Sequence, residues 1–280
     1  MESNQLERLS ALGHAGRMAV FRLLVRRYPE FLPSGELARI QDAKPNTMSV
    51  YLTALLRAGL IEQKRDGRSL LYRADLDGAD DLVAYLFKDC CRGRPQICTT
   101  DQRANLEDHA DTPSPRYNIL FICTGNSARS IFAETILRDL GGDRFIAYSA
   151  GTRPASELNP LAVELLRDKG HDVAPLRAKH ISEFQAEGAP VMDFVFTVCD
   201  QAANEECPAW AGQPVTAHWG ASDPVKATGA LAERRLAFQQ AYGILKNRIS
   251  LFTVLHPENL ARAALQARVD EIARTERDHR

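Results

Sequence analysis

The sequence predicts a chain of two domains: a mainly helical first domain with one β-hairpin, and an α/β second domain with a parallel sheet. Residues 5–92 place apolar side chains at helical spacing and contain one Asp-Gly pair between two strand-like runs. Residues 99–116 are rich in Asp, Thr, Pro, Ser and Arg and show no period, which is typical of a linker. From Tyr117 onward, apolar strand-like runs alternate with helical patterns, and this alternation favours a parallel sheet.

The composition is that of a globular protein. The 280 residues are 45% hydrophobic and 25% charged, and the length favours two domains. A formal net charge of −1 argues against binding nucleic acid through bulk charge, although it permits a local basic patch. No apolar run reaches membrane-spanning length and no signal-peptide pattern is present, so we expect a cytoplasmic location. Six cysteines in a reducing compartment indicate catalytic, redox or metal-binding roles.

The first domain is expected to begin with helices. Apolar residues at helical spacing are Leu9, Leu12, Met18, Val20, Phe21, Leu23 and Leu24. Ser34 has the character of an N-cap and starts a short helix that runs through Ile40. The turn at residues 44–46 opens a second helix, which ends at Gly59.

A hairpin and a last helix follow in the first domain. Residues 60–65 and 68–73 are strand-like, and the Asp66-Gly67 pair between them is a strong hairpin signal. A helix over residues 82–87 then leads into Cys90-Cys91.

The second domain shows four strand candidates in α/β order. They are residues 118–122, 145–148, 194–198 and 214–218. Helices lie between them and over residues 231–252, and the Ala, Arg and Glu-rich tail is expected to form a surface helix. The expected divisions of the chain are residues 1–98, a linker at 99–116, an α/β domain at 117–256 and a tail at 257–280.

The most informative segment is a cysteine, five further residues and an arginine, placed between a strand and a helix. Cys123 and Arg129 bound this loop, whose members are Thr124, Gly125, Asn126, Ser127 and Ala128. Loop N–H groups and the helix dipole at such a turn bind an oxyanion, and the fork of Arg129 can grip two of its oxygens. The same field favours a thiolate, so we expect the pKa of Cys123 to fall below that of an ordinary thiol.

These residues resemble a known family. Residues 120–130, together with residues 148–151 and Asn159-Pro160, resemble the low molecular weight tyrosine phosphatases over residues 117–255. Within that fold the chain is similar to the arsenate reductases, because Cys199 and Cys207 form a downstream cysteine pair. A His-Trp-Gly segment at residues 218–220 precedes Asp223-Pro224, and no tyrosine follows, whereas the phosphatases usually carry aromatic residues there.

The resemblance implies a three-cysteine mechanism. Cys123 would attack arsenate held by the loop, Asp223 would protonate the departing oxygen, and Ser130 and Asn126 would support the thiolate and the loop. Cys199 would then attack Cys123 and release arsenite, and Cys207 would form a disulfide with Cys199 for an external reductant.

The resemblance leaves the reductant open between thioredoxin and glutaredoxin with glutathione, and it implies no tightly bound cofactor. The spacing from Cys199 to Cys207 is slightly longer than in some thioredoxin-linked relatives, so both reductant systems stay as alternatives. Ala128 occupies a position where many relatives have a second cysteine, but its loss removes no step of the mechanism.

The first domain resembles the winged-helix repressors of the ArsR/SmtB family over residues 5–92, through residues 9–14, Arg17 and residues 47–61. The resemblance implies operator DNA as a partner and a dimer formed by the first and last helices. Its DNA-facing candidates are Lys44, Asn46, Thr47, Ser49 and Tyr51 on the recognition helix, and Lys64, Arg65 and Arg68 on the wing. A winged helix that binds a protein instead is the alternative.

A second cysteine cluster is the candidate inducer site. Cys90, Cys91 and Cys98 offer three thiolates, which suit As(III) in trigonal sulfur coordination, with Sb(III) as a mimic. Some members of the family carry the cysteine pair at the start of the DNA-binding motif, but residues 36–40 of this chain contain none. Zinc is disfavoured because no fourth ligand is evident.

The sequence therefore predicts a bifunctional protein, an arsenic-responsive repressor fused to a thiol-dependent arsenate reductase. One alternative is a phosphatase of the same fold that acts on a phosphorylated protein. A second is a pure regulator whose α/β domain binds arsenate or phosphate without turnover. Channelling of arsenite between the domains is a further hypothesis, although a long polar linker is equally compatible with independent domains.

Overall fold

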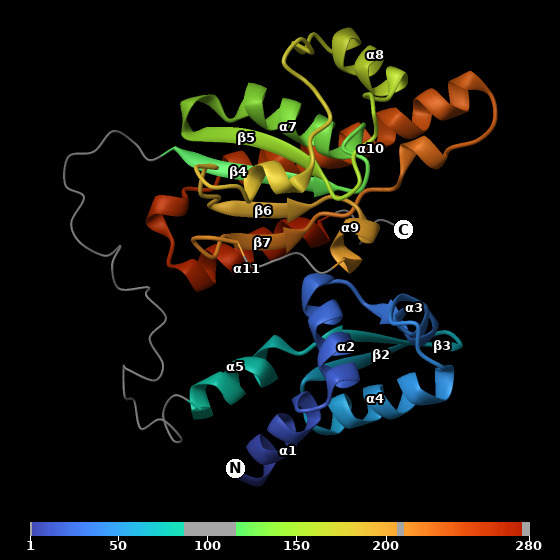
Figure 1. The fold of residues 1–280 in the computed structure, drawn as a ribbon, viewed down its shortest axis with the longest axis vertical. Helices are drawn as coiled ribbons and strands as arrows, with labels where there is room; N and C mark the ends of the chain where they lie inside the picture. The colour runs from blue at the N-terminus through green and yellow to red at the C-terminus, as the bar shows by residue number, and fades with distance from the viewer. Residues whose placement is uncertain (1, 87–115, 206–209, 276–280) are drawn as a thin grey trace. The chain divides into compact units, whose positions relative to one another are not determined.

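A computed structural model describes residues 2–86, 116–205 and 210–275 of the chain (Figure 1). It divides the chain into two units, residues 1–113 and 114–280, and the boundary lies inside the segment that composition marks as a linker. Each unit has its own hydrophobic core. Among the described residues, no helix is both long and apolar enough to cross a membrane.

The first unit combines helices with a small antiparallel sheet. Its helices are α1 (Glu2–Leu12), α2 (Ala15–Arg26), α3 (Ser34–Ile40), α4 (Pro45–Arg57) and α5 (Leu76–Tyr85). Its strands, in the sheet order β1-β3-β2, are β1 (Leu32–Pro33), β3 (Ser69–Ala74) and β2 (Ile61–Asp66). The order along the chain therefore places two consecutive helices, α3 and α4, directly before the β2–β3 hairpin (Figure 1).

Helix α4 begins and ends as its sequence requires. Pro45 is the first helical residue, where the missing N–H costs no hydrogen bond and the fixed φ suits a helix. Met48, Leu52 and Leu55 recur on one face and are buried in the core of the unit. Gly59 follows the helix with φ +62, a conformation that glycine adopts without strain.

The hairpin turn lies one residue further along the chain than expected. Asp66 pairs with Ser69, so the two central residues of the turn are Gly67 and Arg68 rather than Asp66 and Gly67. Gly67 has φ +55, and a positive φ at the first central residue is what a two-residue hairpin turn of this kind requires.

Two helix starts also differ from expectation. Ser34 is the first residue of α3, and Pro33 is its N-cap. The last helix begins at Leu76 rather than at Leu82, because the Asp75 carboxylate accepts a hydrogen bond from the Gly78 amide at 3.1 Å and caps the helix there.

The second unit contains a four-stranded parallel sheet, which confirms the predicted α/β class. The strands in sheet order are β5 (Phe145–Gly151), β4 (Tyr117–Cys123), β6 (Phe194–Thr197) and β7 (Val215–His218). Its α-helices are α7 (Arg129–Leu140), α8 (Pro160–Asp168), α9 (Asp200–Asn204), α10 (Leu231–Thr253) and α11 (Arg262–Arg274). Short 3-10 turns lie at Gly142–Arg144, Ile181–Phe184, Pro224–Lys226 and Pro257–Asn259.

The packing places the end of β4 at the centre of the sheet edge. β4 lies between β5 and β6, and its residues from Ile119 to Cys123 are buried. α7 packs on β4 and β5, α11 packs on β7, and α10 contacts both helices (Figure 1). The carboxyl ends of β4 and β6 therefore lie side by side, which is where parallel α/β folds bind ligands.

The helix expected in the tail is present as α11, with one face exposed, but its other face packs into the second unit, so the expectation of a separate tail is wrong. Leu265, Val269 and Ile272 lie on one face of α11 and are buried in the core of the second unit. The buried Trp219 indole N–H donates to the Val269 carbonyl at 3.2 Å. The spacing of these apolar residues, three to four apart, outweighs the polar composition of the segment.

Candidate active site

The loop between β4 and α7 is held in place by hydrogen bonds that a neighbouring segment donates to the loop carbonyl groups. Amides of the segment at residues 152–159 donate to the carbonyls of Cys123, Thr124, Gly125 and Ser127 at 2.8–3.1 Å. Because a trans peptide group points its C=O and N–H in opposite directions, the following loop amides point to the other side. The loop therefore forms a concave turn whose N–H groups face the Cys123 side, which is the arrangement that binds an oxyanion.

Cys123 lies at the bottom of this loop. Its side chain is buried, with Sγ 2.9 Å from the Ser130 hydroxyl oxygen and 3.1 Å from the Asn126 amide nitrogen, which donates to it. Burial raises the pKa of the Cys123 thiol, the neighbouring Cys199 adds to the rise, and hydrogen bonds with Ser130 and the charge of Arg129 oppose it. The expected fall in this pKa is therefore wrong, because loss of hydration outweighs the favourable field of the loop.

Asn126 connects the loop to three other elements. It is fully buried and has φ +43, a backbone conformation in which asparagine is among the better tolerated residues. Its side-chain Nδ2 donates to the hydroxyls of Ser130 and Ser149 at 2.8 Å each, and its side-chain oxygen accepts from the backbone amide of Lys179 at 2.7 Å. All polar groups of this side chain are thus used to fix the loop.

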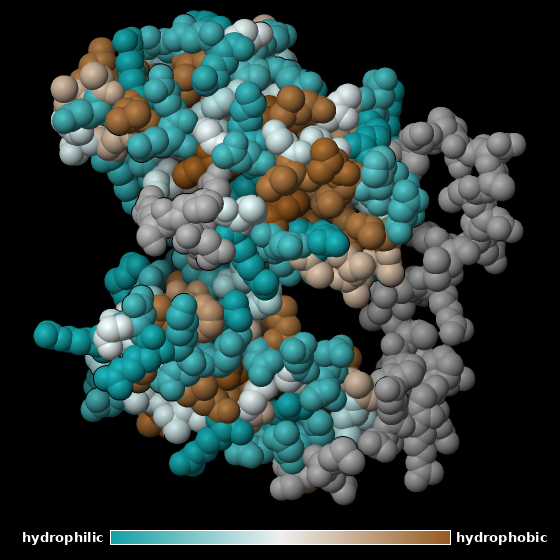
Figure 2. Space-filling model, turned by 180° about the vertical axis from the view of Figure 1, so that it is seen from behind, coloured by the Kyte–Doolittle hydropathy of each residue, from teal (hydrophilic) through white to brown (hydrophobic). Residues whose placement is uncertain are grey.

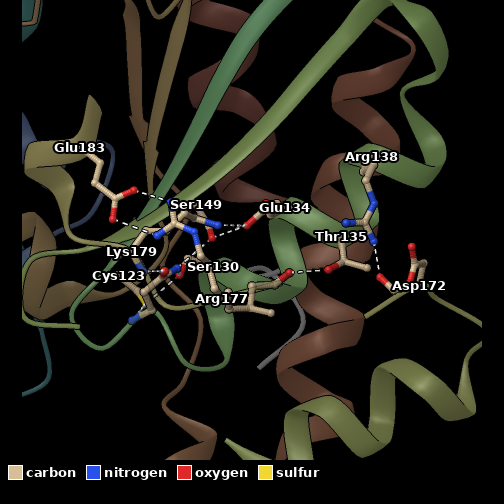
Figure 3. Close-up of polar contacts among 12 residues, drawn as sticks. Cys123, Ser130, Glu134, Thr135, Arg138, Ser149, Asp172, Arg177, Lys179 and Glu183 are labelled. Carbon is tan, nitrogen blue, oxygen red and sulfur yellow. Dashed lines mark hydrogen bonds and ion pairs between the residues drawn. The ribbon is translucent and has the colours of Figure 1, made fainter. Parts of the chain in front are cut away.

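A largely buried ion pair between Lys179 and Glu134 lies behind this network (Figure 3). The Lys179 ammonium donates to Glu134 at 2.9 Å, and the Ser149 hydroxyl donates to the same carboxylate oxygen. Since Ser149 gives its proton to Glu134, its oxygen is left to accept from Asn126. Ser130 likewise accepts from Asn126, and its hydroxyl shares a hydrogen bond with the sulfur of Cys123, in which it is the donor when that sulfur is a thiolate.

Sequence reasoning missed Glu134 and Lys179. Glu134 lies one turn after Ser130 on α7, so its position on the same helix face is readable from the sequence. Lys179 has no such signal, because it enters the site from a loop far along the chain.

Arg129 and Asp223 face each other at the mouth of the loop. One Arg129 Nη lies 3.0 Å from a carboxylate oxygen of Asp223, and the other donates to the Ala221 carbonyl at 3.2 Å. The second carboxylate oxygen of Asp223 accepts from the Val225 amide at 3.2 Å. The guanidinium and the carboxylate are therefore held together, although they are distant in sequence.

Cys199 is the second thiol at this edge of the sheet. It follows β6, it is buried, and its Sγ lies 3.4 Å from the hydroxyl oxygen of Thr124, the loop residue next to Cys123. Cys123 and Cys199 are free thiols in the described part of the chain. Cys207 lies outside the described residues.

Comparison with known proteins identifies the family of the second unit. The family model of the low molecular weight phosphotyrosine protein phosphatases matches residues 118–262. The chain belongs to the low molecular weight phosphotyrosine protein phosphatase family. The match spans the loop, Cys199 and Asp223, and it extends to the first residue of α11.

Named relatives of this phosphatase family include arsenate reductases. The chain is 37% identical over 134 residues to an arsenate reductase of Shouchella clausii, which covers 48% of this chain and 93% of the relative. It is 36% identical over 134 residues to an arsenate reductase of Bacillus subtilis, with the same shares covered.

Solved structures of the phosphatase fold are also similar. An arsenate reductase of Archaeoglobus fulgidus matches with a TM-score of 0.40 at 20% identity, over 48% of this chain and 98% of that one. The tyrosine phosphatase Wzb of Escherichia coli K30 in complex with sulphate matches with a TM-score of 0.39 at 21% identity, over 49% of this chain and 95% of that one.

The candidate DNA-facing residues of the first unit lie on α4 and on the hairpin. Lys44 is the N-cap of α4, and Asn46 and Ser49 are exposed on it, while Thr47 is half-buried. Tyr51 is also half-buried, because its ring packs against Gly16 and lies 5.1 Å from the ring of His14. The side chains of Lys64, Arg65 and Arg68 are exposed on the hairpin.

The predicted inducer cysteines, Cys90, Cys91 and Cys98, lie outside the described residues. α5, the helix that precedes them, is described as far as Tyr85. Their role as ligands of As(III) or Sb(III) stays a prediction.

Proposed function

We propose that the second unit is an arsenate reductase and that the first unit is an arsenite-responsive repressor of the same chain. The observation that carries the reductase proposal is the meeting of two thiols at an oxyanion loop. Cys199 lies against Thr124, one residue from Cys123, at the junction of β4 and β6. A phosphatase needs one thiol, whereas reduction of arsenate by the protein needs a second one within reach.

The reaction begins with attack of the Cys123 thiolate on arsenate bound by the loop amides and Arg129. A sulfur–arsenic bond forms, and one arsenate oxygen leaves after taking a proton from Asp223. The contact with Arg129 holds the Asp223 carboxyl at the mouth of the loop, where its protonated form meets the leaving oxygen. The Ser130 hydroxyl stabilises the Cys123 sulfur whenever it carries negative charge.

Reduction follows when the Cys199 thiolate attacks the sulfur of Cys123. The disulfide forms, the sulfur–arsenic bond breaks, and its electron pair stays on arsenic, which leaves as arsenite. Arsenic gains two electrons and the two thiols lose two. The Cys207 thiolate then attacks Cys199, Cys123 leaves as a thiolate, and an external dithiol reduces the Cys199–Cys207 disulfide.

The external dithiol is thioredoxin, with glutaredoxin and glutathione as the competing system. The test is arsenate-dependent NADPH oxidation with either system, for the native chain and for Cys123→Ser, Cys199→Ser and Cys207→Ser. We expect each substitution to abolish turnover with thioredoxin, and Cys98→Ser to leave it unchanged as a matched control. If Cys207→Ser keeps its turnover with glutathione, the external thiol, and not Cys207, reduces the Cys123–Cys199 disulfide. Absence of turnover with both systems would contradict the reductase proposal.

A phosphatase is the second candidate for the same site. Membership of the phosphatase family and the Arg129–Asp223 pair favour it. Hydrolysis of an aryl phosphate that depends on Cys123 and is unaffected by Cys199→Ser would support this candidate. A folded unit that binds arsenate or phosphate with no turnover of either kind would support a purely regulatory role.

The proposal for the first unit rests on the succession of α3, α4 and the β2–β3 hairpin. This order is that of a winged helix, in which α4 would enter the major groove and the hairpin would contact the backbone. Lys44, Asn46, Ser49 and Thr47 would then lie near base edges, while Lys64, Arg65 and Arg68 would neutralise phosphates. The packing of Tyr51 on α2 leaves it the least suited of the candidates to contact DNA.

The proposed repressor acts as a homodimer. On the side that Figure 2 shows, the coloured surface is mainly hydrophilic and carries separate hydrophobic patches. Leu6 and Leu9 on α1 and Val83 on α5 are exposed at 57%, 36% and 64%, and α1 contacts α5. These exposed apolar side chains of α1 and α5 would be buried if the two helices packed against a second copy of the chain.

The repressor proposal is tested by binding of the chain to the DNA upstream of its own coding region. We expect dimeric binding that arsenite or antimonite releases, and loss of that release in Cys90→Ser and Cys91→Ser, with Cys98→Ser showing whether a third thiolate is needed. Binding that falls steeply with salt and weakens in Lys64→Ala would support the wing contacts. No DNA binding at low salt would contradict the proposal.

A further inference from the structure

Helix α4 has one buried face and one exposed face. Met48, Leu52 and Leu55 are buried in the core of the first unit. The residues of the opposite face follow one another at helical spacing and are exposed, and they are Asn46, Ser49, Val50, Thr53 and Arg57. This exposed face is the part of α4 that can meet a partner of the first unit.

The centre of the exposed face is apolar. Val50 is 64% exposed, but single exposed apolar side chains are common on protein surfaces, so exposure alone assigns no role to it. Its surroundings are more informative. A hollow of about 470 Å³ on α4 is lined by Val50 together with Asn46, Ser49, Thr53, Ala54 and Arg57. None of these lining residues is acidic, so the hollow combines an apolar centre with hydrogen-bonding and positively charged side chains around it.

Thr53 adds a methyl group to this apolar centre. Its hydroxyl donates a hydrogen bond to the Ser49 carbonyl at 2.8 Å, one turn back along α4. A threonine that bonds the preceding turn in this way uses its hydroxyl proton within the helix. The Thr53 methyl group and the Val50 side chain lie three residues apart on one helix face, and together they form the apolar part of the hollow.

Thymine is the base that matches such a surface. In the major groove it presents a C5-methyl group, and small apolar groups such as the threonine methyl contact it there. Asn46 lies one turn before Val50, and its amide can pair with N6 and N7 of an adenine. The positive charge of Arg57 suits the phosphate backbone beside these bases.

We propose that Val50 and Thr53 read the methyl groups of thymines in the half-site of the operator, next to an adenine read by Asn46. The inference rests on the proposed DNA binding by the first unit, and it adds which bases are read and by which groups. Val50 and Thr53 thereby supply the base contacts in the middle of α4, where the ring of Tyr51 is packed against Gly16.

The test uses the full chain and duplexes of the DNA upstream of its own coding region, limited to the stretch that the chain protects from cleavage. Each thymine of that stretch is replaced in turn by deoxyuridine, which lacks only the methyl group, and Kd is measured at one fixed salt concentration. We expect thymines in each half-site whose replacement weakens binding about fourfold, as the loss of one buried methyl group predicts. Replacement of the other thymines should leave Kd unchanged.

Variants of α4 assign the sensitive thymines to side chains. Val50→Ala should weaken binding to the thymine duplex about fourfold and abolish the effect of deoxyuridine at one position. Thr53→Ser keeps the hydroxyl and should abolish that effect at a second position. Val254→Ala is the matched control, because Val254 is 69% exposed in the second unit, and it should bind as the native chain does. Both substitutions on α4 truncate exposed side chains, so they leave the core intact.

The outcomes separate this inference from the repressor proposal. Equal Kd values for thymine and deoxyuridine at every position, with DNA binding intact, would overturn the reading of methyl groups and leave the repressor proposal standing. Sensitivity to deoxyuridine that persists unchanged in Val50→Ala and in Thr53→Ser would overturn the assignment in the same way. Absence of DNA binding at low salt would contradict the repressor proposal and this inference together.

Discussion

The two thiols at the sheet edge are held in opposite ways. Cys123 lies in a loop fixed by four carbonyl hydrogen bonds from residues 152–159 and by the buried side chain of Asn126. Cys199 lies at the start of a single helical turn, held there by side chains at the ends of β6 and β7. The difference matches their proposed tasks. A nucleophile and oxyanion site needs a fixed geometry, whereas a relay thiol has to meet two partners in succession.

The largest expected effect concerns the loop that holds Cys123, which is the more firmly fixed of the two regions. Arg129→Lys keeps the positive charge but loses the planar fork that holds two oxygens and Asp223. We expect the kcat/KM for arsenate to fall about 100- to 1,000-fold, in steady-state assays. Arg153→Lys, an exposed arginine paired with Glu205, is the matched control. A loss of less than about threefold in Arg129→Lys would show that the loop does not depend on the guanidinium geometry.

The buried ion pair behind the loop gives the next largest effect. Lys179→Met leaves the Glu134 carboxylate buried without its cation. We expect the free energy of unfolding to fall by about 3 kcal/mol, measured by urea unfolding. Glu134→Gln together with Lys179→Met should restore part of the loss, because no charge is then left unpaired. Unchanged stability in the single variant would mean that the loop is less firmly held than its contacts indicate.

The pH dependence of Cys123 tests the hydrogen bond from Ser130. Burial raises the pKa of Cys123 and Ser130 lowers it, so Ser130→Ala should raise that pKa further. The thiolate fraction then falls at any pH below the pKa, and the alkylation rate of Cys123 near neutral pH should drop about tenfold. Cys199→Ser should change the rate in the opposite direction, since Cys199 raises the pKa of Cys123. If the pH profile of Cys123 alkylation is the same in Ser130→Ala as in the native chain, this account is contradicted.

The smallest expected effect concerns the contact between the Cys123 loop and the Cys199 thiol. Thr124→Val keeps the side-chain shape but removes the hydroxyl 3.4 Å from the Cys199 sulfur. We expect arsenite release in a single turnover to slow about threefold to tenfold, with Thr124→Ser retaining the native rate. Equal rates for both variants would mean that the hydroxyl plays no part in the attack by Cys199.

Local features of the site could be predicted from the sequence, and those set by tertiary packing could not. Cys123 and Arg129 lie in one contiguous loop between a strand and a helix, so their pattern is readable. Lys179 and the contact of His218 with Asp200 join segments far apart in the chain, and no period or spacing marks them. The direction of the Cys123 pKa shift depends on burial, which is a property of the packed fold.

The same distinction between local sequence signals and tertiary packing applies to the fold. The four strands of the second unit lie where apolar runs predicted them, because the buried strands of a parallel sheet are continuously apolar. The start of α5 was missed because a capping contact of Asp75, and not the apolar pattern, sets it. The burial of α11 was missed because Ala, Arg and Glu dominate its composition, although Leu265 and Val269 have the spacing of a core face.

The measurement that tests the central claim most directly is a map of the disulfides after one turnover with arsenate in the absence of reductant. Peptide masses from the native chain and from Cys207→Ser, trapped by alkylation, identify which sulfurs are joined. The account predicts a Cys199–Cys207 disulfide in the native chain, a Cys123–Cys199 disulfide in Cys207→Ser, and one arsenite released per chain in each. Full retention of the thiols of Cys123 and Cys199 in both chains, with no arsenite formed, would contradict the account.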